Sequence, residues 1–193
     1  MNRQQEWGCL LVDDPLCGQS QLISLQKALS DQGGKVDCFT PQGHESFYEQ
    51  LQRSYQQIRR DEAVNGILGR GLGCDCALAL AGQLPTDRLI LLEPLEWHGS
   101  GFEFLRRIQS YARRGAAFCI ADVLVIPGPR TSFSLIRWFQ RCLSNSRLTI
   151  AEPSQPGKTK REEIIKIAIL HYLRHGVLPK SLAENAEMCI IYA

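Results

Sequence analysis

The feature that most restricts the fold of this chain is an alternation of short apolar runs with longer amphipathic runs. The apolar runs are nearly continuous, as expected of strands that are covered on both faces. We expect strands at residues 8–12, 36–39, 64–68, 89–92, 123–126 and 148–150, and helices at 18–32, 45–60, 73–84, 101–114, 132–143 and 161–174. This order predicts a single α/β domain with a mostly parallel, six-stranded sheet and helices on both faces.

The sequence changes character after the last predicted helix. We assign residues 1–176 to the domain and residues 177–193 to a C-terminal tail with a polar middle and a strand-like end, MCIIYA. The tail is expected to pack on the domain, to add an edge strand or to contact a partner. Gly33, Gly34, Gly115 and Gly176 follow the ends of three predicted helices, where left-handed caps are expected.

The composition argues against several classes of function. A formal net charge of +2 gives no electrostatic footprint for nucleic acid. No apolar stretch is long enough to span a bilayer and the N-terminal segment lacks the features of a signal peptide, so we expect a cytoplasmic protein without a membrane partner. The eight cysteines include no C-x-x-C motif, so we expect reduced thiols, no metal and no cofactor.

The stretch ILGRGLGCDCALALAG, residues 67–82, is the most specific motif in the chain. A predicted strand ends in the glycines at positions 69, 71 and 73, and an Ala/Leu-rich helix follows. Hydrolases that hold a nucleophile on a sharp strand-to-helix turn carry G-x-S-x-G at this place. A dinucleotide-binding loop is a rival interpretation, but Cys74 stands where that motif needs glycine, and the turn follows the third predicted strand instead of the first.

Taken in order along the chain, several segments resemble the parts of the α/β-hydrolase fold family. They are WGCLLVDDPLCGQS, VDCFTPQGHES, VNGILGRGLGCDCALALAGQLPTDRLILLEPL, VLVIPGPRT and LTIAEPSQPGKTKREEIIKIAILHYL, and together they cover about residues 6–175. The resemblance implies a minimal version of that topology without a lid, because the loop at 93–100 is too short for an inserted cap. It also implies where a nucleophile, an acid and a histidine would stand.

The residues at those matching positions do not supply the catalytic chemistry of the family. Gly71 stands at the nucleophile position, and the loop that normally carries the acid offers Arg130. The loop AEPSQPGKTK contains no histidine, and Asp13-Asp14 replaces a first loop that commonly carries His-Gly. The sequence therefore predicts no catalytic residue, and a non-catalytic relative that binds a small acyl or anionic ligand or a protein partner.

Ligands collect at the carboxyl ends of the strands in such sheets, so the candidate ligand rim comes from the loops after each strand. The rim residues that we expect are Asp13, His44, Arg70, Gly71, Leu72, Glu93, His98 and Arg130. The alternative is an active carboxylester or thioester hydrolase with a nucleophile outside the family pattern, such as Cys74. The helix N-terminus would lower the pKa of that thiol, whereas the two aspartates would raise the pKa of a second candidate, Cys17. The sequence leaves the oligomeric state open.

Overall fold

The computed structural model describes residues 7–16, 22–40, 47–61, 64–96, 103–154 and 158–192, and its strands form one sheet in the order β2-β1-β3-β4-β5-β6-β7. The strands are β1 Trp7–Val12, β2 Lys35–Phe39, β3 Val64–Arg70, β4 Arg88–Leu92, β5 Asp122–Ile126, β6 Arg147–Pro153 and β7 Met188–Tyr192. The helices are α1 Ile23–Ser30, α2 Phe47–Asp61, α3 Gly73–Ala81, α4 Glu103–Ala116, α5 Phe133–Cys142, α6 Lys158–His175 and α7 Lys180–Glu184. The six predicted strands and six predicted helices are all present, with ends shifted by a few residues.

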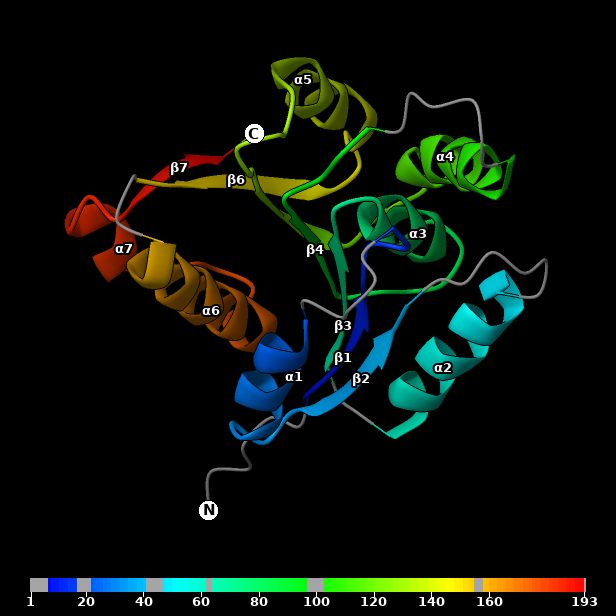
Figure 1. The fold of residues 1–193 in the computed structure, drawn as a ribbon, viewed down its shortest axis with the longest axis horizontal. Helices are drawn as coiled ribbons and strands as arrows, with labels where there is room; N and C mark the ends of the chain where they lie inside the picture. The colour runs from blue at the N-terminus through cyan, green and yellow to red at the C-terminus, as the bar shows by residue number, and fades with distance from the viewer. Residues whose placement is uncertain are drawn as a thin grey trace.

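Helices cover both faces of the sheet, as the sequence predicted (Figure 1). On one face, the buried side chains of α2, α3, α4 and α5 pack against the strands, with Tyr55 and Phe139 among them. On the other face, α1, α6 and α7 contribute Leu25, Ile169 and Leu182 to a second apolar layer. Every residue of β1 is buried between these layers, which explains why its sequence is a continuous apolar run.

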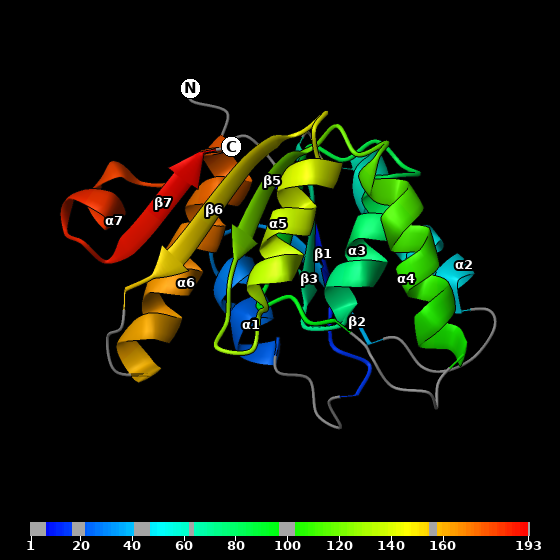
Figure 2. The same cartoon turned by 90° about the horizontal axis from the view of Figure 1, so that it is seen from above.

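The C-terminal tail extends the sheet, so the prediction of six strands is wrong by one. β7 pairs antiparallel with β6 at the sheet edge, with Ile191 opposite Ile150, whereas the other strand pairs are parallel (Figure 2). Leu178, Leu182 and Met188 are buried in the second apolar layer. The five-residue run of β7 follows a polar segment, and from the sequence alone an edge strand was one of three possibilities for it.

Gly115 was expected to cap a helix, but it lies inside α4. A Cβ built on Gly115 would lie 2.9 Å from the Leu78 carbonyl oxygen, and one on Gly82 would lie 2.2 Å from Gly115 Cα. These glycines therefore allow α3 and α4 to pack backbone to backbone. Gly33 and Gly176 do have the positive φ of left-handed caps, at 83° and 69°.

Within the described part of the chain, no helix combines the length and the apolar character that crossing a bilayer requires.

Candidate functional site

The turn between β3 and α3 has the sharp geometry that the sequence predicted. Gly71 has a φ of +57°, a left-handed conformation that glycine adopts without steric cost. Its N–H donates to the Leu92 carbonyl oxygen at 3.0 Å, which fixes the turn against the end of β4. A Cβ built on Gly73 would lie 2.4 Å from the Val12 carbonyl oxygen, so α3 begins in contact with the end of β1.

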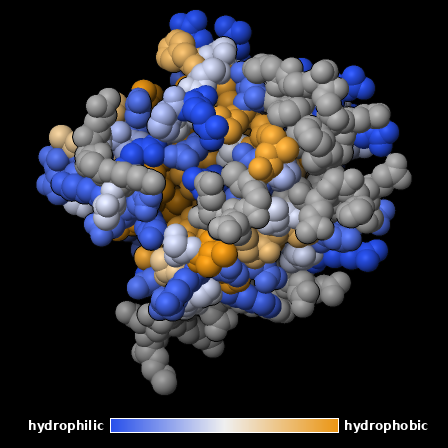
Figure 3. Space-filling view, viewed as in Figure 1, coloured by the Kyte–Doolittle hydropathy of each residue, from blue (hydrophilic) through white to orange (hydrophobic). Residues whose placement is uncertain are grey.

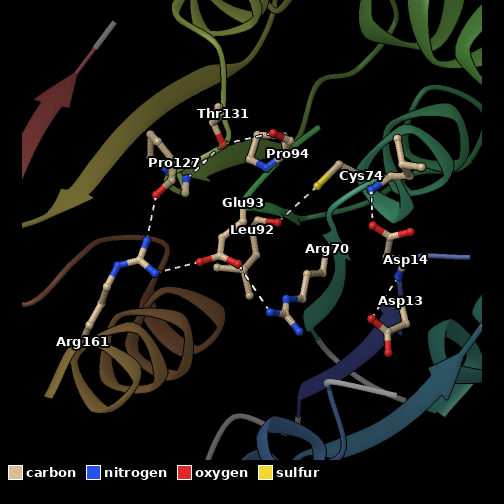
Figure 4. Close-up of polar contacts among 12 residues, drawn as sticks. Asp13, Asp14, Arg70, Cys74, Leu92, Glu93, Pro94, Pro127, Thr131 and Arg161 are labelled. Atoms are coloured by element: carbon tan, nitrogen blue, oxygen red, sulfur yellow. Dashed lines mark hydrogen bonds and ion pairs between the residues drawn. The ribbon is translucent and has the colours of Figure 1, made fainter. Parts of the chain in front are cut away.

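Asp14, two residues beyond the end of β1, fills the space beside Gly71, and Figure 4 shows its side chain next to Asp13. A Cβ built on Gly71 would lie 2.3 Å from Asp14 Oδ2. The same oxygen accepts the Leu72 N–H at 3.3 Å, while Oδ1 accepts the Leu16 N–H at 2.9 Å. The Asp13 carboxylate in turn accepts the Asp14 N–H at 2.9 Å. The Asp14 carboxylate therefore lies where a side chain on residue 71 would begin.

This arrangement has a direct chemical consequence. In acyl transfer at such a turn, the backbone N–H that follows the nucleophile helps to hold the developing oxyanion. Here that group is the Leu72 N–H, and a carboxylate already accepts its hydrogen bond. Position 71 supplies no attacking atom, and the side chain of Asp14 already accepts the hydrogen bond of the neighbouring N–H group.

Glu93, directly after β4, joins arginines from two different elements (Figure 4). Its Oε2 lies 3.4 Å from Arg70 Nη2 at the end of β3, and its Oε1 lies 2.8 Å from Arg161 Nη1 in the first turn of α6. Glu93 has a φ of +50°, a backbone conformation that costs a residue with a Cβ about 1–3 kcal/mol. Its N–H donates to the Ile126 carbonyl oxygen at 2.7 Å. Glu93 is therefore held by its backbone N–H and by its carboxylate, which contacts the two arginines.

Further hydrogen bonds tie together the loops around Glu93. Arg161 Nη2 donates to the Pro127 carbonyl oxygen at 3.2 Å. Thr131 Oγ1 donates to the Pro94 carbonyl oxygen at 3.0 Å and accepts the Gly128 N–H at 2.9 Å. The segments after β4 and β5 and the start of α6 therefore form one connected rim at the carboxyl end of the sheet.

Cys74, the alternative nucleophile, points into the protein. Its side chain is 3% exposed, and its Sγ lies 3.1 Å from the Gly69 carbonyl oxygen and 3.5 Å from that of Leu92. Burial, the largest effect, raises the pKa of the Cys74 thiol well above its ordinary value, and the nearby Asp75 raises it further. The expected lowering of this pKa by the helix N-terminus is wrong, because desolvation of the thiolate outweighs the helix dipole.

The described histidines lie far from this turn. His171 and His175 occupy the C-terminal end of α6, whose first turn contacts Glu93 at the carboxyl end of β4. The helix ends at His175, and a Cβ built on the next residue, Gly176, would lie 2.6 Å from the side-chain Nη2 of Arg88, the first residue of β4. Both histidines are therefore at the amino end of the sheet, and His44 and His98 lie outside the described residues, as does Cys17.

A small cavity of about 40 Å³ opens beside the turn. Roughly 10–15 Å³ of such space is needed to hold one water molecule, so this cavity has room for a few waters at most. Four of the predicted rim residues line it, namely Arg70, Gly71, Glu93 and Arg130, and so does Asp14. Asp13 is fully buried and the side chain of Leu72 lies in the core, so neither of these two predicted rim residues is among those that line the cavity.

A much larger hollow of about 660 Å³ lies between α1 and α6, and we call it the α1–α6 groove. Its described lining consists of Leu22, Ser24, Leu25, Arg70, Leu92, Glu93, Pro129, Arg161, Glu162, Ile165 and Lys166. The sequence did not indicate Arg161 or Asp14 as rim residues. The Asp-Asp pair after the first strand was a usable signal for Asp14, whereas Arg161 lies in an ordinary charged segment of the sequence.

No family model matches the sequence, and the comparison with curated proteins finds no match. Solved structures do match in fold. One is reported under "LipS and LipT, two metagenome-derived lipolytic enzymes", with a TM-score of 0.71, 14% identity, and coverage of 89% of this chain and 94% of the other. Est1E from Butyrivibrio proteoclasticus has a TM-score of 0.67, 13% identity, and coverage of 89% and 88%.

A third structure is MGS-M2, an alpha/beta hydrolase enzyme from a Medee basin deep-sea metagenome library, with a TM-score of 0.54, 12% identity, and coverage of 93% of this chain and 92% of the other. At these identities the likeness concerns the fold. Together with the sheet order and the glycine turn at its carboxyl end, these matches show that the chain has an α/β-hydrolase fold.

Proposed function

We propose that this protein is a non-catalytic member of the α/β-hydrolase fold that binds a small ligand at the carboxyl end of its sheet. The observation that carries the proposal is the Asp14 carboxylate, which takes the place of a side chain at residue 71 and accepts the Leu72 N–H. A scaffold with this arrangement keeps the ligand-binding end of the fold without the group that would attack a carbonyl.

The size and position of the α1–α6 groove favour a small molecule. Ligand pockets commonly measure about 300–1,000 Å³, and this groove of about 660 Å³ lies in that range. It includes Leu92 and Glu93 at the end of β4, where sheets of this type bind ligands. The second form of the proposal is a protein partner, because the side chains of Arg70, Glu93 and Arg161 at this end of the sheet are partly exposed to solvent.

The competing function is an active carboxylester or thioester hydrolase that uses Cys74. The structural neighbours include proteins described as lipolytic enzymes and esterases, which keeps this alternative relevant. The buried position of Cys74 and its raised pKa argue against it, since the thiolate is the attacking form of cysteine.

An ester assay separates the two functions. We expect no turnover of p-nitrophenyl acetate, p-nitrophenyl octanoate or an acyl thioester above the buffer rate, either by the wild-type chain or by Cys74→Ala. Turnover that disappears in Cys74→Ala, with its circular dichroism unchanged, would establish the cysteine hydrolase. Turnover that persists in the variant would also refute the proposal and would place the nucleophile elsewhere.

Thermal-shift measurements with acyl compounds, nucleotides and inorganic anions test the binding half of the proposal. A rise in melting temperature with one of these classes supports the small-ligand form, because a ligand that binds only the folded chain stabilises it. If no class raises the melting temperature, the small-ligand form is refuted and the protein-partner form replaces it.

A further inference from the structure

The α1–α6 groove is amphipathic along its length. Its apolar lining comes from α1, the end of β4 and α6, through Leu22, Leu25, Leu92 and Ile165. Figure 3 shows apolar surface in the middle of this face, bordered by hydrophilic residues. A hollow with one apolar side and one charged side favours an elongated ligand with an apolar chain and a polar head.

The charged lining of the groove carries more positive than negative groups. Arg70, Arg161 and Lys166 line it, against the carboxylates of Glu93 and Glu162. Glu93 is shared between the two arginines, so one carboxylate faces two guanidinium groups. Lys166 makes no ion pair with any residue that the structure describes.

The arginine pair is held in place before any ligand arrives. Arg161 is fixed by Glu93 at 2.8 Å and by the Pro127 carbonyl oxygen at 3.2 Å. The side chains of Arg70, Glu93 and Arg161 are 24%, 23% and 24% exposed, so they are accessible from the groove while remaining partly desolvated. Guanidinium groups in such a setting bind carboxylate and phosphate oxygens through charge-assisted hydrogen bonds.

From this geometry we propose that the α1–α6 groove binds an amphiphile with an anionic head group, a carboxylate or a phosphate monoester. The head group contacts Arg161 and Lys166, and the alkyl chain lies against Leu22, Leu25 and Ile165. This inference rests on the proposed function, because it describes a ligand that is held and not converted. A cationic amphiphile would bring its charge to the side of the groove where three cationic side chains outnumber the two carboxylates of Glu93 and Glu162.

Calorimetric titration with three ligands of equal chain length tests the charge preference. We expect nonanoate and octyl phosphate, below their micellar concentrations, to bind the wild-type chain at least tenfold more tightly than octyltrimethylammonium. The two anions separate a carboxylate ligand from a phosphate ligand. Equal binding of the ammonium compound, or no binding of either anion at millimolar concentration, would overturn the proposal.

Two variants and a matched control test the site. Arg161→Gln and Lys166→Gln should each weaken anion binding at least fivefold, and Lys166→Gln remains informative if loss of the Glu93 contact unfolds the first variant. Lys160→Gln removes the same charge from the same helix outside the groove lining, where Lys160 pairs with Glu187, and it should stay within twofold of wild type. If all three variants weaken anion binding equally, the effect comes from the overall charge of the protein and not from the groove, and the proposal is overturned.

A p-nitrophenyl octanoate assay on the same samples keeps this inference distinct from the proposed function. Hydrolysis of the ester would refute the non-catalytic function whatever the anions do. Absence of both hydrolysis and anion binding would refute the amphiphile inference alone.

Discussion

At the scale of single residues, the contact between Asp14 and Gly71 decides what the glycine turn can do. The two positions are 57 residues apart in the sequence, and the Asp14 carboxylate fills the space that a side chain at residue 71 would take. Asp14 needs a neighbour without a side chain, and its carboxylate completes the hydrogen bonding of the turn at the Leu72 N–H. Substitutions at these two positions should therefore be coupled.

We expect Gly71→Ala to lower the free energy of unfolding by about 2–4 kcal/mol. Roughly 1–2 kcal/mol comes from the left-handed backbone and the rest from overlap with the Asp14 carboxylate. In an Asp14→Ala background the same substitution should cost about 1–2 kcal/mol, because the overlapping oxygen is gone. Urea unfolding of the four proteins measures this cycle, and additive effects would mean that the two side chains do not compete for the same space.

Asp75, in the first turn of α3, lines a separate hollow of about 330 Å³ with Glu96, Gln109, Arg113 and Trp138. Burial raises the pKa of Asp75 to about 7, and the nearby Glu96 adds to this effect, while Arg113 and a hydrogen bond from Gln109 oppose it. Between pH 4 and 7 the folded chain therefore binds more protons at this group than the unfolded chain does. The contribution of Asp75 to stability must then fall as the pH rises through this window.

Asp75→Asn should consequently stabilise the protein by about 1–2 kcal/mol at pH 8, and the gain should shrink towards zero near pH 4.5. Chemical unfolding at several pH values measures this. The control is Glu49→Gln on α2, which removes a carboxylate whose side chain is 71% exposed and is measured at the same pH values. A stability gain for Asp75→Asn that is equal at both pH values would contradict the assignment.

At the scale of the elements, β7 changes the edge of the sheet. The strand is joined to the body on one side by the β6 ladder and on one face by Met188, which is 3% exposed. Ile191 lies on the opposite face of the strand and is 50% exposed. The side chain of Met188 therefore anchors the tail in the apolar layer, whereas that of Ile191 is largely in contact with solvent.

Met188→Ala should lower the free energy of unfolding by about 2–3 kcal/mol, because it leaves a cavity in the layer between α6, α7 and the sheet. Ile191→Ala, in the same strand, should cost less than about 1 kcal/mol. Thermal unfolding compares the two variants directly. Similar small effects for both would indicate that β7 contributes little to the stability of the domain.

At the scale of the whole molecule, the sequence predicted the architecture because the signals for it are local. Continuous apolar runs mark buried strands such as β1 and β4, and the glycine turn follows directly from residues 69–73. The exposed β2 fits the pattern less well, because it lies at the sheet edge and its residues are half-buried or exposed. The sheet edge formed by β7 depends on packing of Leu178 and Leu182, which no local pattern reveals.

The site was less predictable, because its contacts join distant parts of the chain. The pairing of Glu93 with Arg161 spans 68 residues and depends on where α6 begins relative to the end of β4. Arg70, Glu93 and Arg130 line one hollow because the carboxyl ends of parallel strands share one edge of the sheet, whereas their role in binding stays a prediction. The groove itself is a space between α1 and α6, and the size of such a space is set by tertiary packing.

The position of Asp14 also restricts how this chain could change. Replacing Gly71 by serine alone would place the new side chain against a carboxylate oxygen and destabilise the fold before it could assist any reaction. A serine side chain can be accommodated at position 71 only after Asp14 has been replaced by a smaller residue. The order of substitutions is therefore constrained, and a library that randomises position 71 by itself should return folded clones dominated by the parental glycine.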